Sequence, residues 1–357
     1  MAKVSMLFSF LLGLVLLSQA HGSGEKIGFY ELRRGDFEMR VTNYGATVLS
    51  VVLPDRNGNL ADVVLGYDSI KSYVNDTTYF GGLIGRVANR IGHAEFTLDG
   101  KTYKLPANDH GNTLHGGFKG FNNVIWTVTS YKRDSHITFH YNSYDNEQGF
   151  PGKLEVDVTY MLMDTNKLVV KMIAKAIDKD TPVNLAVAQH TYWNMRGHNT
   201  GDVLSHRVQI FASKITPVNA KLIPTGKLQS VKGTPYDFRR PKEVGKQIDD
   251  LPGLYDINFA VDRKSKKHLN KVAVVRDPVS GRQMELWSNQ VGVQFYTSGM
   301  LNNTVGGKDG AVYKKHAGIA LETQGFPDSV NHPNFPSQIV RPGQIYQHYM
   351  VYRFTAY

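Results

Sequence analysis

Short segments rich in β-branched and aromatic residues recur along most of this chain, and they constrain it to a fold built from strands. Several alternate apolar and polar residues, the pattern of a strand with one buried face. Hairpin-type dipeptides separate them at Asn57-Gly58, Asp99-Gly100 and Ser280-Gly281. The predicted strands are Phe37–Val41, Thr47–Leu53, Val63–Leu65, Trp126–Thr129, Ile137–Tyr141, Leu154–Tyr160, Leu168–Ala174, Val208–Phe211, Lys271–Val275 and Gln294–Tyr296.

Helical patterning is scarce, and Lys242–Leu251 is the best candidate for a short helix. Strands do not alternate with helices, which argues against a Rossmann or TIM-barrel arrangement. No repeat, low-complexity tract or linker divides residues 25–357. We therefore predict an all-β fold: one large antiparallel β-sandwich of two twisted sheets over residues 25–357.

Composition narrows the classes of function. The chain of 357 residues lacks cysteine, which excludes disulfides, thiolate metal sites and a cysteine nucleophile, so the domain must be stabilised by burial. The formal net charge is +10, but the basic residues are scattered. No RNA-binding aromatic signature accompanies the densest basic cluster, around Arg263 and Lys264, so we expect no nucleic-acid partner.

The first 24 residues have the pattern of a secretory signal peptide. Lys3 precedes an apolar run from Leu7 to Leu17, and cleavage is expected near Ala20 to Gly24. The run is about half the length that a membrane span requires. We predict a secreted, extracellular or ER-lumenal protein, or a membrane-anchored one if the leader stays uncut. Two sequons agree with this route and predict a glycoprotein: Asn75-Asp76-Thr77 and Asn302-Asn303-Thr304.

Four segments carry more polar and aromatic residues than strands need, and they contain the candidate functional residues. Asn-Arg and His-Gly-Gly sequences offer donors to hydroxyl groups, and aromatic faces beside amides suit a sugar ring. Each segment alone also fits a structural turn, an aromatic cluster or an ion pair. Motifs for metal binding and for a serine nucleophile are missing, so no metal site is expected. The candidates are Asn89, Arg90, His115, His190, Tyr192 and Glu322.

Taken together and in order, these segments resemble the aldose 1-epimerase (galactose mutarotase) family. The resemblance covers essentially the whole chain after the leader. It rests on GGLIGRVANRIG, NTLHGG, GFPG, QHTYWNM, TPYDFRRPKEVG, YDINF, VGVQFYTSGML, LETQGFPDSVNHPNFP and RPGQIY.

The resemblance implies a galactose-mutarotase-type β-sandwich with a groove across one sheet, no cofactor, and an aldohexose such as galactose or glucose as substrate. A monomer is expected. By position, Glu322 matches the family's general base and His190 its general acid. The residues that match sugar-binding positions, or line the same segment in the case of Tyr192, are Asn89, Arg90, His115, Tyr192, Asp256 and Gln294.

The implied chemistry is ring opening and closure. One group removes the proton of the C1 hydroxyl while another protonates the ring oxygen, with Glu ionised and His holding or sharing a proton near neutrality. Three departures from the family pattern are Gln189, Trp193 and Ile257. We expect Gln189 and Ile257 to change hydrogen bonding beside the ligand and so the preferred sugar.

Two other functions remain open at this point. The same scaffold could serve a non-catalytic sugar-binding or cell-surface interaction protein, for which the leader is the argument. It could also epimerise hexose 6-phosphates, which would need an additional cationic pocket.

Overall fold

A computed structural model describes residues 26–357 except 75, 185–189, 252–253 and 265–267. The predicted leader, Asn75 and Gln189 lie outside the described residues. Antiparallel strands dominate, and within the described ranges the one α-helix is the short α1, Ile70–Val74. No helix in this part of the chain is long and apolar enough to span a membrane. The all-β prediction is confirmed.

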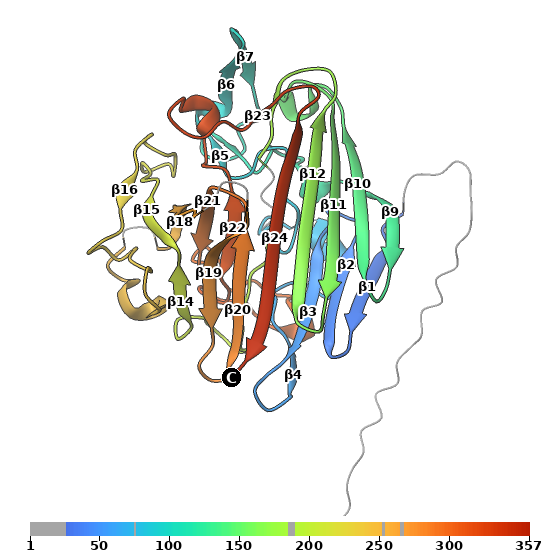
Figure 1. The fold of residues 1–357 in the computed structure, drawn as a ribbon, viewed down its shortest axis with the longest axis vertical. Helices are drawn as coiled ribbons and strands as arrows, with labels where there is room; N and C mark the ends of the chain where they lie inside the picture. The colour runs from blue at the N-terminus through green and yellow to red at the C-terminus, as the bar shows by residue number, and fades with distance from the viewer. Residues whose placement is uncertain (1–25, 75, 185–189, 252–253, 265–267) are drawn as a thin grey trace, which may run out of the picture.

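One layer of the sandwich is a nine-stranded sheet (Figure 1). Its central strands alternate buried and more exposed residues, as in β12, where every second side chain is buried. In sheet order the strands are β17 (Lys242–Glu243), β14 (Arg207–Ile210), β19 (Asn270–Arg276), β20 (Arg282–Ser288), β24 (Ile345–Ala356), β12 (Lys167–Ala176), β11 (Leu154–Met163), β10 (His136–Ser143) and β9 (Thr127–Lys132).

The second layer joins a five-stranded and a four-stranded sheet through one extended segment. Trp193 forms isolated bridges with Ile319, which precedes β22, and with Val64, which follows β4. The strands in sheet order are β16 (Gln229–Ser230), β15 (Ala212–Ile215), β18 (Asp256–Val261), β21 (Gly292–Tyr296) and β22 (Ala320–Gln324), then β1 (Phe29–Arg34), β2 (Phe37–Thr42), β3 (Val48–Pro54) and β4 (Leu60–Asp62).

Short elements complete the fold. Small hairpins and bridges bring loops together over the ends of the layers, and 3₁₀ turns connect them. These elements are β5 (Arg90–Ile91) with β8 (Thr113–Leu114), β6 (Glu95–Leu98) with β7 (Lys101–Lys104), β13 (Thr181–Pro182) with β23 (Ile339–Val340), and η1 (Gly92–Ala94), η2 (Phe121–Asn123), η3 (Glu147–Gly149), η4 (Val244–Gln247), η5 (Lys308–Gly310) and η6 (Ser329–Asn331).

Most predicted strands are confirmed within a residue or two, but two predictions are wrong. The segment 63–65 contains only the isolated bridge of Val64 to Trp193. The expected helix at 242–251 instead pairs Lys242 with Val208 of β14 and then makes the 3₁₀ turn η4. Pairing with a neighbouring strand satisfies the backbone there, so a local helical preference is overridden.

The main core fills the space between the two layers and contains side chains from both. In the second layer, Ile257 of β18, Phe295 of β21 and Leu321 of β22 point into this core. Because side chains alternate along a strand, the even-numbered residues of these three strands face the outer side of the layer. That outer face carries the candidate site.

Trp193 joins the halves of the second layer, and its loss should destabilise the protein. Its buried ring packs against Tyr352 and Phe354 of β24, with centroids 5.4 and 5.7 Å away. We expect Trp193→Ala to lower the free energy of unfolding by about 3–5 kcal/mol, as for other buried aromatics, in urea denaturation. The exposed Tyr144 is the control, and Tyr144→Ala should change stability by less than about 0.5 kcal/mol. Equal effects in the two variants would contradict this assignment.

Candidate functional site

A pocket of about 240 Å³ opens on the outer face of β18, β21 and β22. Its volume lies just below the range of about 300–1,000 Å³ that holds drug-sized ligands, so it suits a smaller molecule such as a monosaccharide. The lining residues are Thr77, Thr78, Tyr79, Asn89, Arg90, Leu114, His115, His190, Tyr192, Asp256, Gln294, Tyr296, Met300, Leu301 and Glu322. All eight residues proposed from the sequence are among them.

The floor of the pocket is a polar row across the three strands. Gln294 of β21 lies directly opposite Glu322 of β22, and its amide nitrogen donates to Asp256 Oδ1 of β18 at 2.6 Å. Behind this row, Gln324 Nε2 donates to Gln294 Oε1 at 3.3 Å. The amide of Gln294 is therefore fixed in one orientation, and it holds the carboxylate of Asp256 in place.

Glu322 and His190 face each other in the pocket. His190 Nε2 lies 3.6 Å from Glu322 Oε1, and the two residues are 6% and 2% exposed. Within the described residues, Glu322 Oε2 and His190 Nδ1 are buried without a hydrogen-bond partner. A buried polar atom left unpaired costs about 1–3 kcal/mol, so such atoms mark a place where a ligand is expected to supply partners.

Backbone hydrogen bonds fix the position of His190. Its N–H donates to the carbonyl of Gly82, and its carbonyl accepts from the N–H of Gly81, both at 3.0 Å. Gly81 has a φ of +64°, and a Cβ there would lie 2.0 Å from the carbonyl oxygen of Val48. This glycine is required for the close approach, which explains why a glycine pair precedes the Asn-Arg sequence.

Burial sets the protonation of the pair. Burial, reinforced by the charge of Asp256 and opposed by Arg90, raises the pKa of Glu322 to about 8. Burial lowers the pKa of His190 to about 3. At neutral pH the empty pocket therefore holds one proton on Glu322 and a neutral imidazole. This differs from the expectation of an ionised Glu322, because burial disfavours the charged carboxylate.

Arg90 is the cation of the pocket, and two carboxylates hold it. Its Nε donates to Asp109 Oδ2 at 2.7 Å, and its Nη1 lies 3.9 Å from Asp256 Oδ2. Asp109 is a positioning residue that the sequence analysis missed, since it lies in a loop without a recognisable pattern. Asn89 accepts the backbone N–H of Arg90 through Oδ1, so its carboxamide nitrogen is the group that it can offer to a ligand.

His115 enters the pocket as a neutral donor. Its Nδ1 accepts the backbone N–H of Asn89 at 3.2 Å, and burial holds the pKa of His115 well below its ordinary value. The proton therefore sits on Nε2, where it can donate to a ligand oxygen. Pairing of β5 with β8 brings the two segments together, because Arg90 lies opposite Leu114.

Aromatic rings close the pocket around His190. Tyr192 and Tyr79 lie 5.1 and 5.5 Å from its ring centroid, and Tyr296 lies 6.4 Å away. The Tyr192 hydroxyl donates to the carbonyl of Thr78, so Tyr192 borders the pocket mainly with its ring. Tyr79 and Tyr296 were not proposed from the sequence, although Tyr296 lies in the quoted VGVQFYTSGML segment.

Comparison with known proteins identifies the arrangement. Residues 28–353 match the sequence model of the family described as Aldose 1-epimerase. The chain belongs to the aldose 1-epimerase family. It is 42% identical to the galactose mutarotase of Mus musculus and 41% identical to that of Homo sapiens, each over 341 residues, 95% of this chain and 96% of the relative. The aldose 1-epimerase of Escherichia coli strain K12 is 34% identical over 320 residues, 88% of this chain and 91% of the relative.

Solved structures agree with the family assignment. The fold is similar to a GalM/aldose epimerase homologue from C. elegans, with a TM-score of 0.86 and 29% identity, covering 93% of this chain and 99% of that chain. It also resembles galactose 1-epimerase from Lactobacillus acidophilus NCFM, with a TM-score of 0.78 and 22% identity over 92% of this chain and 98% of that chain, a likeness of fold alone. The predicted galactose-mutarotase-type β-sandwich is confirmed.

Two of the three departures from the family pattern lie away from the pocket. Ile257 points into the main core, so the expectation that it alters hydrogen bonding beside the ligand is wrong. It follows Asp256 on β18, and alternation places the two side chains on opposite faces. Trp193 is also a core residue. Among the described residues, no group of three His, Asp or Glu side chains could hold a metal ion.

Proposed function

We propose that this aldose 1-epimerase family member interconverts the α and β anomers of aldohexoses by general acid/base ring opening, with Glu322 and His190 as the proton-transfer pair. The observation that carries this proposal is the buried pair itself, with 3.6 Å between His190 Nε2 and Glu322 Oε1 and one unpartnered atom on each side chain among the described residues. The relatives named galactose mutarotase make D-galactose the first substrate to test.

The reaction needs one titratable proton shared between Glu322 and His190. In ring opening, one member takes the proton of the C1 hydroxyl while the other gives a proton to the ring oxygen, and the C1–O5 bond breaks. The aldehyde then rotates about C1–C2, and ring closure on the other face returns both protons. The number of protons on Glu322 and His190 together is unchanged after each turnover. A pair whose single proton can sit on either member therefore serves both directions.

The surrounding groups would orient the sugar and stabilise charge. The Nε2–H of His115 and the Arg90 guanidinium can donate to the developing aldehyde or ring oxygen. Asp256, held by Gln294, can accept hydrogen bonds from ring hydroxyls. The rings of Tyr79 and Tyr192 offer apolar faces to the C–H side of the sugar.

The charges of the pocket favour a neutral sugar over a sugar phosphate. Arg90 is the one Lys or Arg among its lining residues, and Asp109 and Asp256 already engage it. A phosphate group would need an additional cation. This argues against the hexose 6-phosphate alternative, and the proton-transfer pair argues for catalysis over sugar binding alone.

Replacing either member of the pair should stop mutarotation. We expect Glu322→Gln and His190→Asn each to lower kcat for fresh α-D-galactose by about 10²–10⁴-fold, measured by polarimetry, because each removes one proton-transfer group. Galactose binding by Glu322→Gln, measured by calorimetry, should persist. The exposed Glu95→Gln is the matched control and should leave the rate unchanged. Wild-type rates in either pair variant would remove that residue from the mechanism, and galactose binding without turnover in the wild type would support the binding-protein alternative.

The pH profile should report the proton on Glu322. Because the pKa of Glu322 is about 8, we expect kcat/KM to stay level near neutrality. Above pH 8 it should fall about tenfold per pH unit, since Glu322 has then lost its proton. Burial is the main cause of this raised pKa and the charge of Asp256 adds to it, so the fall should begin at lower pH in Asp256→Asn, whatever the overall rate. The exposed Asp134→Asn should leave the profile in place. A kcat/KM that rises through pH 8 would show that the reactive form has lost this proton.

We also propose that the protein enters the secretory pathway, with residues 1–24 as a cleaved leader, and that it acts as a glycosylated monomer. Asn302 of the second sequon is exposed and follows Leu301 of the pocket lining.

Expression of the full chain in a secreting eukaryotic host tests this route. We expect the protein in the medium, with a mature N-terminus between His21 and Glu25 by mass spectrometry, and a glycan that Asn302→Gln removes. A membrane-bound protein that still begins with Met1 would instead show that the leader is an uncut anchor. Intact leader in a soluble cytosolic product would contradict the secretory prediction.

A further inference from the structure

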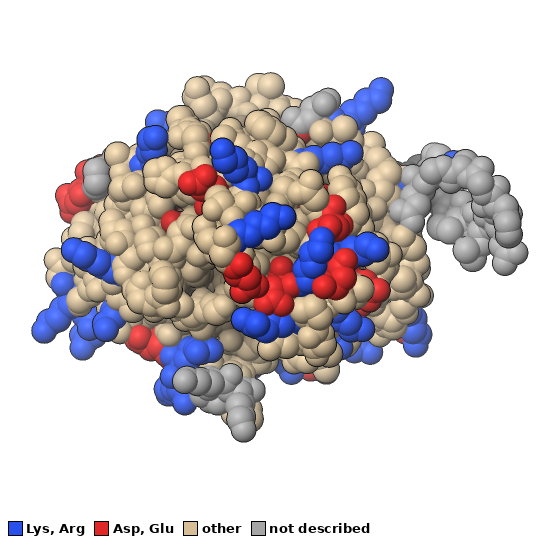
Figure 2. Space-filling model, turned by 90° about the horizontal axis from the view of Figure 1, so that it is seen from above, with Lys and Arg blue, Asp and Glu red and all other residues tan. Residues whose placement is uncertain are grey.

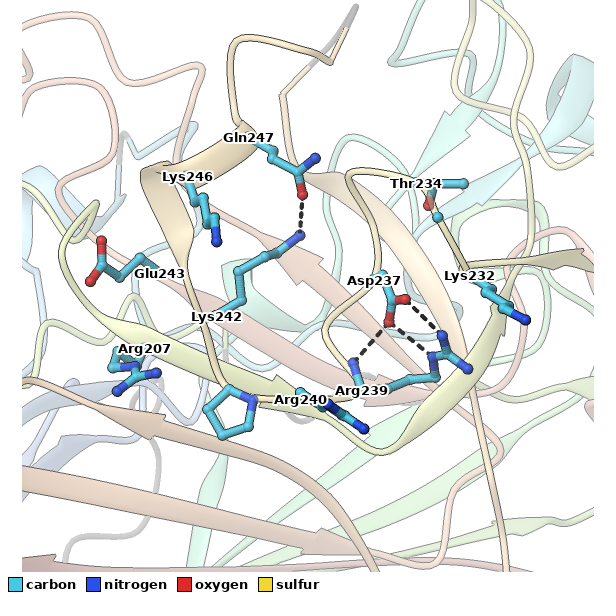
Figure 3. Close-up of a pocket in the computed structure, with 12 residues that line it drawn as sticks. Arg207, Lys232, Thr234, Asp237, Arg239, Arg240, Lys242, Glu243, Lys246 and Gln247 are labelled. Atoms are coloured by element: carbon cyan, nitrogen blue, oxygen red, sulfur yellow. Dashed lines mark hydrogen bonds and ion pairs between the residues drawn. The ribbon is translucent and has the colours of Figure 1, made fainter.

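A second, larger depression lies apart from the sugar pocket and is strongly basic. It has a volume of about 1,100 Å³ and shares no lining residue with the pocket. Figure 2 shows several Lys and Arg side chains at the lower left, the side on which β14 to β16 lie in Figure 1, with a few Asp and Glu side chains near them. The cations that line the depression are Arg207, Lys232, Arg239, Arg240, Lys242 and Lys246 (Figure 3).

Most of these cations are free to bind an anion. The lining contains six Lys or Arg and two carboxylates, a formal charge of +4. Asp237 is engaged by Arg239, which donates to it from Nε at 2.9 Å and from Nη2 at 2.7 Å. Lys242 donates to the carbonyl of Pro235 and to Gln247 Oε1. Within the described residues, the remaining four cations have no ion-pair partner, and their charges are therefore uncompensated (Figure 3).

A smaller basic depression adjoins the first. It has a volume of about 410 Å³, shares Arg207 and Pro241 with the larger one, and adds Arg56 and Arg276. No carboxylate is among its lining residues. The two depressions together form an extended basic track centred on Arg207, longer than a single small anion needs.

We propose that this track binds an extended acidic polysaccharide, a glycan chain that carries sulfate or carboxylate groups. Arginine guanidinium groups match the planar or tetrahedral oxygens of such groups with paired hydrogen bonds. Glu243, Thr234 and Gln247 line the same depression and can bond sugar hydroxyls (Figure 3). A ligand with both anions and hydroxyls would use both sets of side chains.

Other polyanions fit this lining less well. Neither depression contains an aromatic residue, so bases of single-stranded nucleic acid would find no stacking partner. The carboxylate of Glu243 would repel the phosphates of DNA or of phosphatidylserine, and neither the DNA backbone nor that headgroup offers it a free hydroxyl. A concave track also accommodates a single chain better than a flat membrane surface.

The test is binding of a fluorescent heparin octasaccharide to the mature protein in about 0.15 M NaCl, measured by anisotropy. We expect saturable binding that weakens with salt, and a Kd at least about tenfold higher for Arg207→Ala/Arg240→Ala, since two free cations of the track are lost. Mutarotation by this variant should match the wild type, which shows that it is folded and that the two sites are separate.

The matched control removes two charges elsewhere on the same sheet. Lys171 and Lys175 are exposed on β12, four strands from β14 and about 19 Å away, beyond two Debye lengths. Lys171→Ala/Lys175→Ala should leave the Kd within about twofold.

Each of the following results would overturn the proposal: no heparin binding at this salt, equal losses in the two double variants, or tighter binding of single-stranded DNA or phosphatidylserine vesicles through the same arginines. Neutral maltooctaose should not bind, and if it binds as tightly as heparin, the anionic groups are not what the track recognises.

Discussion

The function that we propose for this protein depends on one carboxyl group buried beside one imidazole. Glu322 and His190 are desolvated together, so neither charge is favoured, and a single proton remains on the pair near neutral pH. A water-exposed pair would hold a carboxylate and a titrating imidazole instead. Burial is therefore the source of the chemistry, and the rest of the fold has to provide a buried surface that is still open to a sugar.

The second layer of the sandwich provides that surface. Its inner face is apolar and packs against the nine-stranded sheet, while its outer face carries a polar row fixed by amide hydrogen bonds from Gln294 and Gln324. Gly292 permits this packing, because a Cβ there would lie 2.5 Å from Asn258 Oδ1. Strands hold such a row more rigidly than loops could, so Glu322 keeps its position although its Oε2 has no hydrogen-bond partner among the described residues.

Period-two patterning and hairpin dipeptides predicted the all-β class, and most of the strands predicted from them are present, because both are local properties. The longest strand, β24, was missed because aromatic residues such as Tyr346, Tyr349 and Tyr352 occupy both faces and hide the alternation. The site residues came from collinear motifs. Asp109 and Tyr79 were missed because only the folded loops bring them to Arg90 and His115. The protonation of Glu322 could not be read from sequence, since it depends on burial.

The two recognition surfaces differ in charge, and this difference keeps their ligands apart. The sugar pocket places Asp256 and Asp109 around its one guanidinium, so a polyanion gains little by entering it. The basic track has uncompensated cations and no buried acid/base pair, so a neutral hexose gains little there. A net charge of +10 does not imply an anionic substrate, because Arg90 is the one Lys or Arg that lines the sugar pocket and two carboxylates engage it.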